Sequence, residues 1–576
     1  MAMHTRPPAL SWQAPPAWAA ALLGAAAIWL ASPLSGLGQE APAPSIPDFR
    51  AADYGDYMSA QLAWEQGDFA TAGRRLEALA ERNPQEPAWI EGAVSAHLAA
   101  GDPGAALRLA QMQQRTAPAA LVGVARVTLA ADALSNRQWR EAQDLLDGVT
   151  AAPEDSATLR LVAGLLQAWA QAGRGDEDRA LDQVAGLPRP RAAASALPFQ
   201  RAMMLEGARR YVEADAAYGE AAAGQRLLVE DILRYAAFLE RRQGESAARA
   251  YLDSLRDRIG NIAYEAARAG RYTAPAPTPQ RSAALGLVGY GRGLAAEDAA
   301  FDAAMVLSLA LLIDPGQDGG RLALAVQLRA MDQSERSLAV AAGIEPTSVY
   351  YEAAQVEVAE IMAEAGRTEE ALARIRQVAA ETRGRFAVRA LADLTLTAGA
   401  HAEAEAAFTR LIAMNEGEPA QWRPFFGRAQ ARDHLGRWPE AESDFRAALT
   451  IDADEPELLI GLALGLLRNG GAPDEALRLM EQAYRSDPRG AATLAGLGEA
   501  YLAIGRIEDA ATVLDQALRR APGDADIAES LGDALWRLGD RRRARYMWSR
   551  ALNRQTDDEE RAGLVGKLES GLVQAP

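Results

Sequence analysis

Few side chains in this sequence could do chemistry, and histidine is the first to consider. No two of the four histidines lie four residues apart on a predicted helix, and none stands beside the glutamate of a metal-binding pair. These residues are His4, His97, His401 and His434. Cysteine is absent, which excludes disulfides, cysteine-ligated zinc and thiol nucleophiles. The sequence contains neither a Gly-x-Ser-x-Gly elbow nor a Ser-x-x-Lys motif, so we expect no catalytic residue, no metal and no cofactor.

A glycine-rich stretch is the second candidate, because glycine loops can wrap phosphate groups. A phosphate loop also needs Gly-Lys-Ser/Thr, and a dinucleotide turn needs a preceding strand; neither is present. The stretch contains Gly286, Gly289, Gly291 and Gly293. Asp314, Asp318 and Gly319 partly match a calcium loop, but the acidic spacing and the closing Glu are missing. We therefore predict helix packing at the glycines and an ordinary turn at the aspartates.

Charge excludes one class of partner. The net charge is −18, whereas a nucleic-acid groove needs a basic stripe, so we expect no nucleic-acid partner. A short basic run near the C-terminus departs from this acidity: Arg541, Arg542, Arg543 and Arg545. We predict a solvated helix face there, pairing with Asp557 to Glu560. Contact with an anionic lipid or a polyanion is the alternative.

The spacing of apolar and small residues indicates which elements carry these side chains. From Ala491 to Leu502 apolar residues recur three and four positions apart, which predicts a helix with one buried face. Gly498 would let a second helix approach closely, and Gly505 suits the left-handed conformation that ends a helix. In the second helix Leu514 fills the space between two small alanines, and a proline stops the helix. The full pattern is Leu494, Leu497, Gly498, Tyr501, Gly505, Ala510, Leu514, Ala517 and Pro522.

This pattern resembles the tetratricopeptide repeat, in which Leu-Gly and Tyr are followed by Ala, an aromatic or Leu, and a closing Pro. It recurs with the period of that family: Gly539 follows Gly505 by 34 residues (539 − 505), and Gly101 follows Gly67 by the same interval (101 − 67). The register also places Gly291 where two helices pack. The resemblance implies an all-α superhelical solenoid of antiparallel helix hairpins, about ten to twelve by the period.

The N-terminus has the layout of a secretory signal. Ala17 to Ala31 is an uninterrupted apolar run, shorter than the roughly 20 residues of a spanning helix, and small residues lead from it to Gly38. We predict cleavage after Gly38 and a periplasmic or secreted protein. The alternative is an uncleaved inner-membrane anchor with the repeats facing the periplasm, and only then is the membrane a partner.

Composition and period divide the chain into six predicted segments. They are the signal peptide or uncleaved anchor (1–38), a proline-rich linker (39–50), an N-terminal degenerate repeat array (51–271), a proline-rich break (272–280), a C-terminal repeat array (281–555), and a capping helix with a tail (556–576).

The resemblance also implies a function, because this family binds peptides or partner helices in a concave groove through residues of the first helix of each hairpin. It predicts a non-enzymatic scaffold of the bacterial envelope whose groove, acidic beside an exposed aromatic, favours a basic and partly apolar ligand. One alternative is an inner-membrane-anchored regulator of envelope or polysaccharide assembly. Another is an enzyme or carbohydrate-binding protein that uses the second array's groove. The groove residues implied are Phe426, Asp433, His434, Glu499, Leu502, Asp526, Glu529, Asp533, Trp536 and Arg537.

Overall fold

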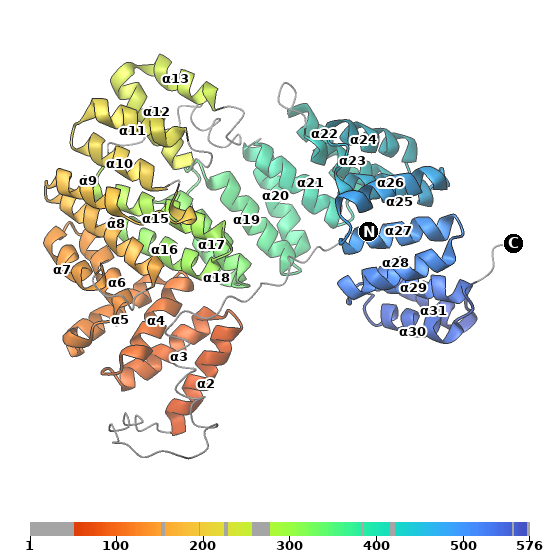
Figure 1. The fold of residues 1–576 in the computed structure, drawn as a ribbon, viewed down its shortest axis with the longest axis horizontal. Coiled ribbons are helices and arrows are strands. Elements are labelled where there is room, and N and C mark those ends of the chain that lie inside the picture. Colours follow the sequence, from red (N-terminus) through yellow and green to blue (C-terminus); the bar gives the residue numbers. More distant parts are fainter. Residues whose placement is uncertain are drawn as a thin grey trace, which may run out of the picture. The chain divides into compact units, whose positions relative to one another are not determined.

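The computed structural model describes residues 51–150, 156–194, 196–223, 229–255, 277–382, 384–414, 421–555 and 558–572. Within these ranges the regular structure is helical, without strands, as the all-α prediction requires (Figure 1). No helix in the described ranges is long and apolar enough to cross a membrane. The predicted signal peptide and linker lie outside these ranges, as do residues 272–276 of the predicted break.

The chain forms two compact units, Met1–Arg374 and Ile375–Pro576. In unit 1 helix pairs follow one another through short turns, with the 3-10 helices η1 (Pro118–Ala120) and η2 (Arg191–Ala193) between some of them. The helices of unit 1 are α2 (Ala51–Glu65), α3 (Phe69–Arg82), α4 (Pro87–Ala99), α5 (Pro103–Thr116), α6 (Gly123–Ser135), α7 (Trp139–Thr150), α8 (Ala157–Gly173), α9 (Glu177–Gly186), α10 (Ala196–Gly207), α11 (Tyr211–Ala222), α12 (Val229–Gln243), α13 (Glu245–Ser254), α15 (Pro279–Ala295), α16 (Ala300–Ile313), α17 (Asp318–Ala330), α18 (Ser334–Ala341) and α19 (Tyr351–Glu364).

Unit 2 continues the same helix-pair arrangement, and α20 (Thr368–Thr382) crosses the boundary between the units. Its helices are α21 (Arg385–Thr397), α22 (His401–Met414), α23 (Trp422–His434), α24 (Trp438–Ile451), α25 (Pro456–Arg468), α26 (Pro473–Ser486), α27 (Ala491–Ala503), α28 (Ile507–Arg520), α29 (Ala525–Arg537), α30 (Arg541–Leu552) and α31 (Asp558–Ser570). The last of these is the predicted capping helix.

Close helix packing depends on small residues at the predicted positions. A Cβ atom built on Gly498 would lie 2.5 Å from Cγ of Leu514, and one built on Gly291 would lie 2.8 Å from Cγ of Leu307. Both distances are too short for real carbon atoms, so a side chain at either glycine would push the paired helices apart. The glycine-rich stretch therefore serves helix packing, as predicted, and lies within α15.

The turn inside each hairpin uses a left-handed residue, and the degenerate repeats keep this conformation without glycine. Gly67, Gly101 and Gly505 have φ values of 77°, 70° and 79°. Arg137 and Arg209 adopt φ of 60° at the equivalent turns after α6 and α10. A side chain in this region is strained by about 1 kcal/mol or more, because its Cβ approaches the backbone.

We expect Arg137→Gly and Arg209→Gly each to stabilise unit 1 by about 1 kcal/mol, because glycine relieves this strain. The matched reverse change, Gly101→Ala, should destabilise by a similar amount or more, since its Cβ would also lie 3.1 Å from Cδ1 of Leu328. Urea midpoints of the three variants measure the effect. Destabilisation by both arginine replacements would show that their side-chain contacts outweigh the strain.

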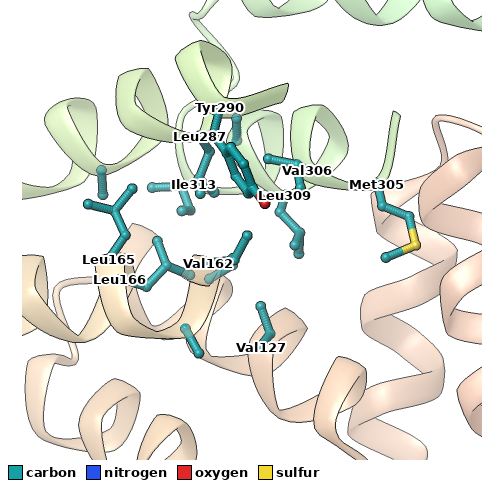
Figure 2. Close-up of a cluster of buried hydrophobic side chains, with 14 of the residues drawn as sticks. Val127, Val162, Leu165, Leu166, Leu287, Tyr290, Met305, Val306, Leu309 and Ile313 are labelled. Carbon is teal, nitrogen blue, oxygen red and sulfur yellow. The ribbon is translucent and has the colours of Figure 1, made fainter. Parts of the chain in front are cut away.

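The inner face of the first helix pairs in unit 1 is filled by the chain itself. The first helices α4, α6 and α8 contact one another and so form the inner layer. Later in the sequence, α16 packs on α4 and α6, and α15 packs on α8 and α10 (Figure 1). Apolar side chains from both sides meet there, as Figure 2 shows for Val127 and Val162 of the inner layer and Val306 and Leu309 of α16.

Polar contacts fix the position of these later helices. The Ser308 hydroxyl donates to the Leu98 carbonyl at 2.7 Å, across 210 residues of sequence. Beyond α16, the Gln333 side-chain amide donates to the Gly67 carbonyl at 3.2 Å, and Arg336 donates to the Ala100 carbonyl at 3.0 Å. The groove of this array is therefore a closed core rather than an open surface.

Unit 2 keeps its first helices on the inside as well. Each first helix pairs with the helix that follows it, and the first helices α21, α23, α25, α27 and α29 also contact their successors. Buried side chains such as Phe445 and Trp548 fill the spaces between the layers. At the C-terminal end α31 packs on α30, and its Leu564 is fully buried. The first helices therefore define the inner face of unit 2.

Candidate interaction surface of unit 2

Three carboxylates from successive parts of the inner layer have no partner among the described side chains. Glu457 and Asp526 are the second residues of α25 and α29, and Glu499 is the ninth residue of α27. No hydrogen bond or ion pair to another described residue is formed by these three carboxylates. We name Glu457, Glu499 and Asp526 the inner acidic row.

The inner acidic row is an unfavourable place for negative charge. Burial raises the pKa of Glu499 to about 7; Arg468 opposes this shift, while Asp526 and Asp524 add to it. Burial and the neighbouring Asp524, Glu560 and Glu529 raise the pKa of Asp526 to about 6. The pKa of Glu457 is also raised, chiefly by desolvation between the helices, although its side chain remains exposed at the surface. Such carboxylates would gain from a cation that the chain itself does not supply.

Three other predicted groove residues are already held by neighbours. Asp433 accepts from Arg468 at 2.6 Å and from the Asn469 amide at 2.9 Å, which ties α23 to α25. Asp533 accepts from Trp548 Nε1 at 2.8 Å and from Nζ of Lys567, the only lysine in the chain, at 2.8 Å.

Glu529 accepts from the same Lys567 at 2.6 Å. Lys567 thus binds the end of the inner face to α31 and neutralises two of the predicted acids. These contacts assign Asp433, Glu529 and Asp533 a structural role.

The predicted apolar groove residues are less accessible than expected. Phe426 lies in the core, 8% exposed, because its ring fills the space next to Gly461 and Phe445. Its prediction as a groove residue is therefore corrected to a packing residue. Leu502 is partly buried against the core around Leu514.

Trp536 is not the freely exposed aromatic that was predicted. Its ring contacts Trp548 with centroids 5.1 Å apart, the Arg541 guanidinium lies 3.8 Å from its centroid, and Gly571 packs against it. Arg537 is exposed at the end of α29. Of the ten predicted groove residues, the carboxylates Glu499 and Asp526 thus keep the character expected of them.

The structure brings together two histidines that the sequence places 33 residues apart (434 − 401). The rings of His401 and His434 stack with centroids 4.3 Å apart and planes 4° from parallel. Burial lowers the pKa of both imidazoles, and the charge of His401 contributes to the lowering at His434. In the described part of the chain no group of three or more His, Asp or Glu side chains could hold a metal ion.

We expect NMR titration to give both histidines pKa values below 6.5, and His401→Ala to raise the pKa of His434. A lowered pKa means that the unfolded chain binds more protons near pH 6 than the folded chain does. Stability should therefore decrease as the pH falls through 6.5 and level off below the folded pKa values. The control is His97→Gln, which should leave His434 unchanged; an unshifted His434 in His401→Ala would contradict the stacking.

Sequence reasoning missed Glu457, and also Asp393, whose pKa is raised mainly by burial and which pairs with Arg389 at 3.5 Å. The signal that could have found them is helix register. Asp393 is the ninth residue of α21, as Glu499 is of α27, and Glu457 is the second residue of α25, as Asp526 is of α29.

The turn predicted at Asp314 is an ordinary one. Its carboxylate accepts from the Gly316 backbone N–H at 3.1 Å and from the Gln317 amide at 2.8 Å, and α17 begins at Asp318. These contacts close a turn between helices, so the calcium-loop alternative has no support.

Comparison with known proteins agrees with the helical repeats. Family models described as tetratricopeptide repeat match residues 57–120, 389–456 and 467–531. No curated protein matches the chain.

Solved structures with similar folds include three repeat-containing proteins. A tetratricopeptide repeat protein from Parabacteroides merdae is 17% identical over 44% of this chain and 100% of its own, with a TM-score of 0.39. The Cut9–Hcn1 hetero-tetramer of the APC/C is 14% identical over 91% and 97%, with a TM-score of 0.40. A protein from Thermus thermophilus is 22% identical over 32% and 99%, with a TM-score of 0.29.

Proposed function

We propose, from the premise that this chain is a tetratricopeptide repeat protein, that it is a non-enzymatic scaffold which holds a partner protein on the inner face of unit 2. Such repeats generally serve as scaffolds for protein–protein interaction. The observation that carries the proposal is the inner acidic row, whose three carboxylates have no cationic partner among the described residues. Unit 1 is the weaker candidate, because α15 and α16 already cover its inner layer.

The partner that best suits this surface is a basic, partly apolar segment. Lysine or arginine side chains would supply the counter-charge that Glu499 and Asp526 lack. Apolar contact is available from Phe386, which is 38% exposed at the second position of α21, and from the partly buried Leu502. Binding of this kind weakens with salt, because part of the attraction is between partly solvated charges.

A pair of peptides tests this proposal. An amphipathic peptide rich in lysine and arginine should bind the full chain, and its counterpart of equal length with glutamate at the basic positions should not. The double variant Glu499→Gln/Asp526→Asn should weaken binding at least tenfold, about 1.4 kcal/mol. Asp474→Asn/Glu508→Gln is the matched control, since both of its positions are exposed on second helices. Equal affinity for both double variants would sink the proposal.

We further propose that the scaffold works in the bacterial envelope, on the strength of the signal-like N-terminus. Expression in a Gram-negative host, with fractionation and intact mass, tests this. A periplasmic species beginning at Gln39 is the expected result. A full-length species that stays with the membrane after a carbonate wash would support the anchored alternative, and a full-length cytoplasmic species would contradict both.

A further inference from the structure

The outer face of α30 carries a basic stripe on an otherwise acidic chain. Ala544, Trp548 and Ala551 face inward and are buried, so Arg542, Arg543 and Tyr546 project from the opposite side. Tyr546 is 64% exposed, and both arginines are exposed. We name Arg542, Arg543 and Tyr546 the basic stripe.

The two arginines are weakly engaged within the molecule. Arg543 lies 3.8 Å from Asp540, three residues away, and Arg542 forms no ion pair with any described side chain. The predicted pairing with Asp557–Glu560 is not part of the described structure, because the side chains of Asp557 to Glu559 lie outside it. Arg541 and Arg545, by contrast, stack on Trp536 and belong to the packing of the last hairpin.

The basic stripe and the inner acidic row are complementary but cannot meet within one molecule. Asp526 lies on α29, the inner helix of the last hairpin, whereas the stripe lies on the outward side of α30, its second helix. The stripe offers two guanidinium groups beside an exposed aromatic ring. These are the features that the inner acidic row would select in a ligand.

We propose that the basic stripe of one copy docks on the inner acidic row of a second copy. The contact is between different surfaces of the two copies, so it leaves a free stripe at one end and a free row at the other, and head-to-tail addition can continue. A membrane is the poorer occupant, because three residues give a small cationic area on a chain of net charge −18. This inference rests on the proposed function, since both use the inner acidic row.

Sedimentation velocity of the full chain tests the proposal. At about 20 mM salt the average mass should grow with protein concentration, and at about 500 mM salt it should not. Arg542→Glu/Arg543→Glu, and separately Glu499→Arg/Asp526→Arg, should each weaken self-association at least tenfold. An equimolar mixture of the two variants should associate again, because each then supplies the charge that the other needs.

Arg478→Glu/Arg485→Glu is the matched control, since it makes the same change in net charge at exposed positions of α26 and should associate like the parent chain. A chain that stays monomeric at low salt, or a mixture that fails to associate, would overturn the proposal. Loss of binding to phosphatidylserine vesicles in the Arg542→Glu/Arg543→Glu variant of a monomeric chain would assign the stripe to lipid instead. If self-association fails while the basic peptide still binds, the proposed function stands without this inference.

Discussion

Replacing Val306 with aspartate should unfold most of unit 1. Val306 is 1% exposed in α16, between the inner helices and the rest of α15 and α16 (Figure 2). A carboxylate there would be desolvated without a partner, and such a change costs about 4 kcal/mol or more, a large part of the stability of a typical domain. Urea unfolding and limited proteolysis should show early loss of structure before residue 374, while the fragments of unit 2 remain protected.

The same substitution at an exposed site provides the control. Val212 of α11 is 87% exposed, so Val212→Asp should change stability by less than about 0.5 kcal/mol. Equal effects at the two positions would contradict the closed core of unit 1. Loss of both units together in Val306→Asp would show instead that the units unfold as one.

Glu499→Gln should stabilise unit 2 at pH 8 by about 2–3 kcal/mol while weakening ligand binding. The folded pKa of Glu499 is about 7, against a model value of 4.5. Between these values the folded chain binds more protons than the unfolded chain, so stability falls as the pH rises from about 4.5 through 7. Glutamine mimics the protonated form and removes this loss. The gain should therefore be full above pH 7 and vanish near pH 4.

Urea unfolding at pH 4.5, 6 and 8 measures this effect, with Glu508→Gln as the exposed control. A gain that does not grow with pH would contradict the burial of this carboxylate without a partner. A variant that is both more stable and poorer at binding is the pattern expected where a chain keeps an unfavourable charge for the sake of a ligand.

The local architecture could be predicted because each repeat states its own geometry. Gly498 and Leu514 predict their contact, and Gly505 predicts its left-handed turn, since both depend on neighbours within one hairpin. The filling of the inner face of unit 1 could not be predicted this way. It pairs helices about 200 residues apart, and no period in the sequence records that pairing. The one available hint was the composition of α16, AFDAAMVLSLALLI, which is apolar on all sides.

The candidate surface was predictable only where register alone decides exposure. Glu499 and Asp526 follow the register of the first helices, and their lack of partners agrees with it. Phe426 and Asp533 occupy comparable positions but are taken by contacts the register does not contain. The ring of Phe426 turns into the core, and Asp533 is claimed by Lys567, 34 residues downstream (567 − 533).

The helices that fill unit 1 also constrain how the chain can be made. A solenoid of neighbour contacts can fold repeat by repeat as it leaves the ribosome. Here the inner layer from α4 to α10 is synthesised about 100 residues before α15 and α16 exist, so its apolar face must wait without its cover. Ser308 reaches Leu98 only after that delay. Unit 1 should therefore fold late and slowly for a helical protein, and its nascent N-terminal repeats are the stretch on which a chaperone would act.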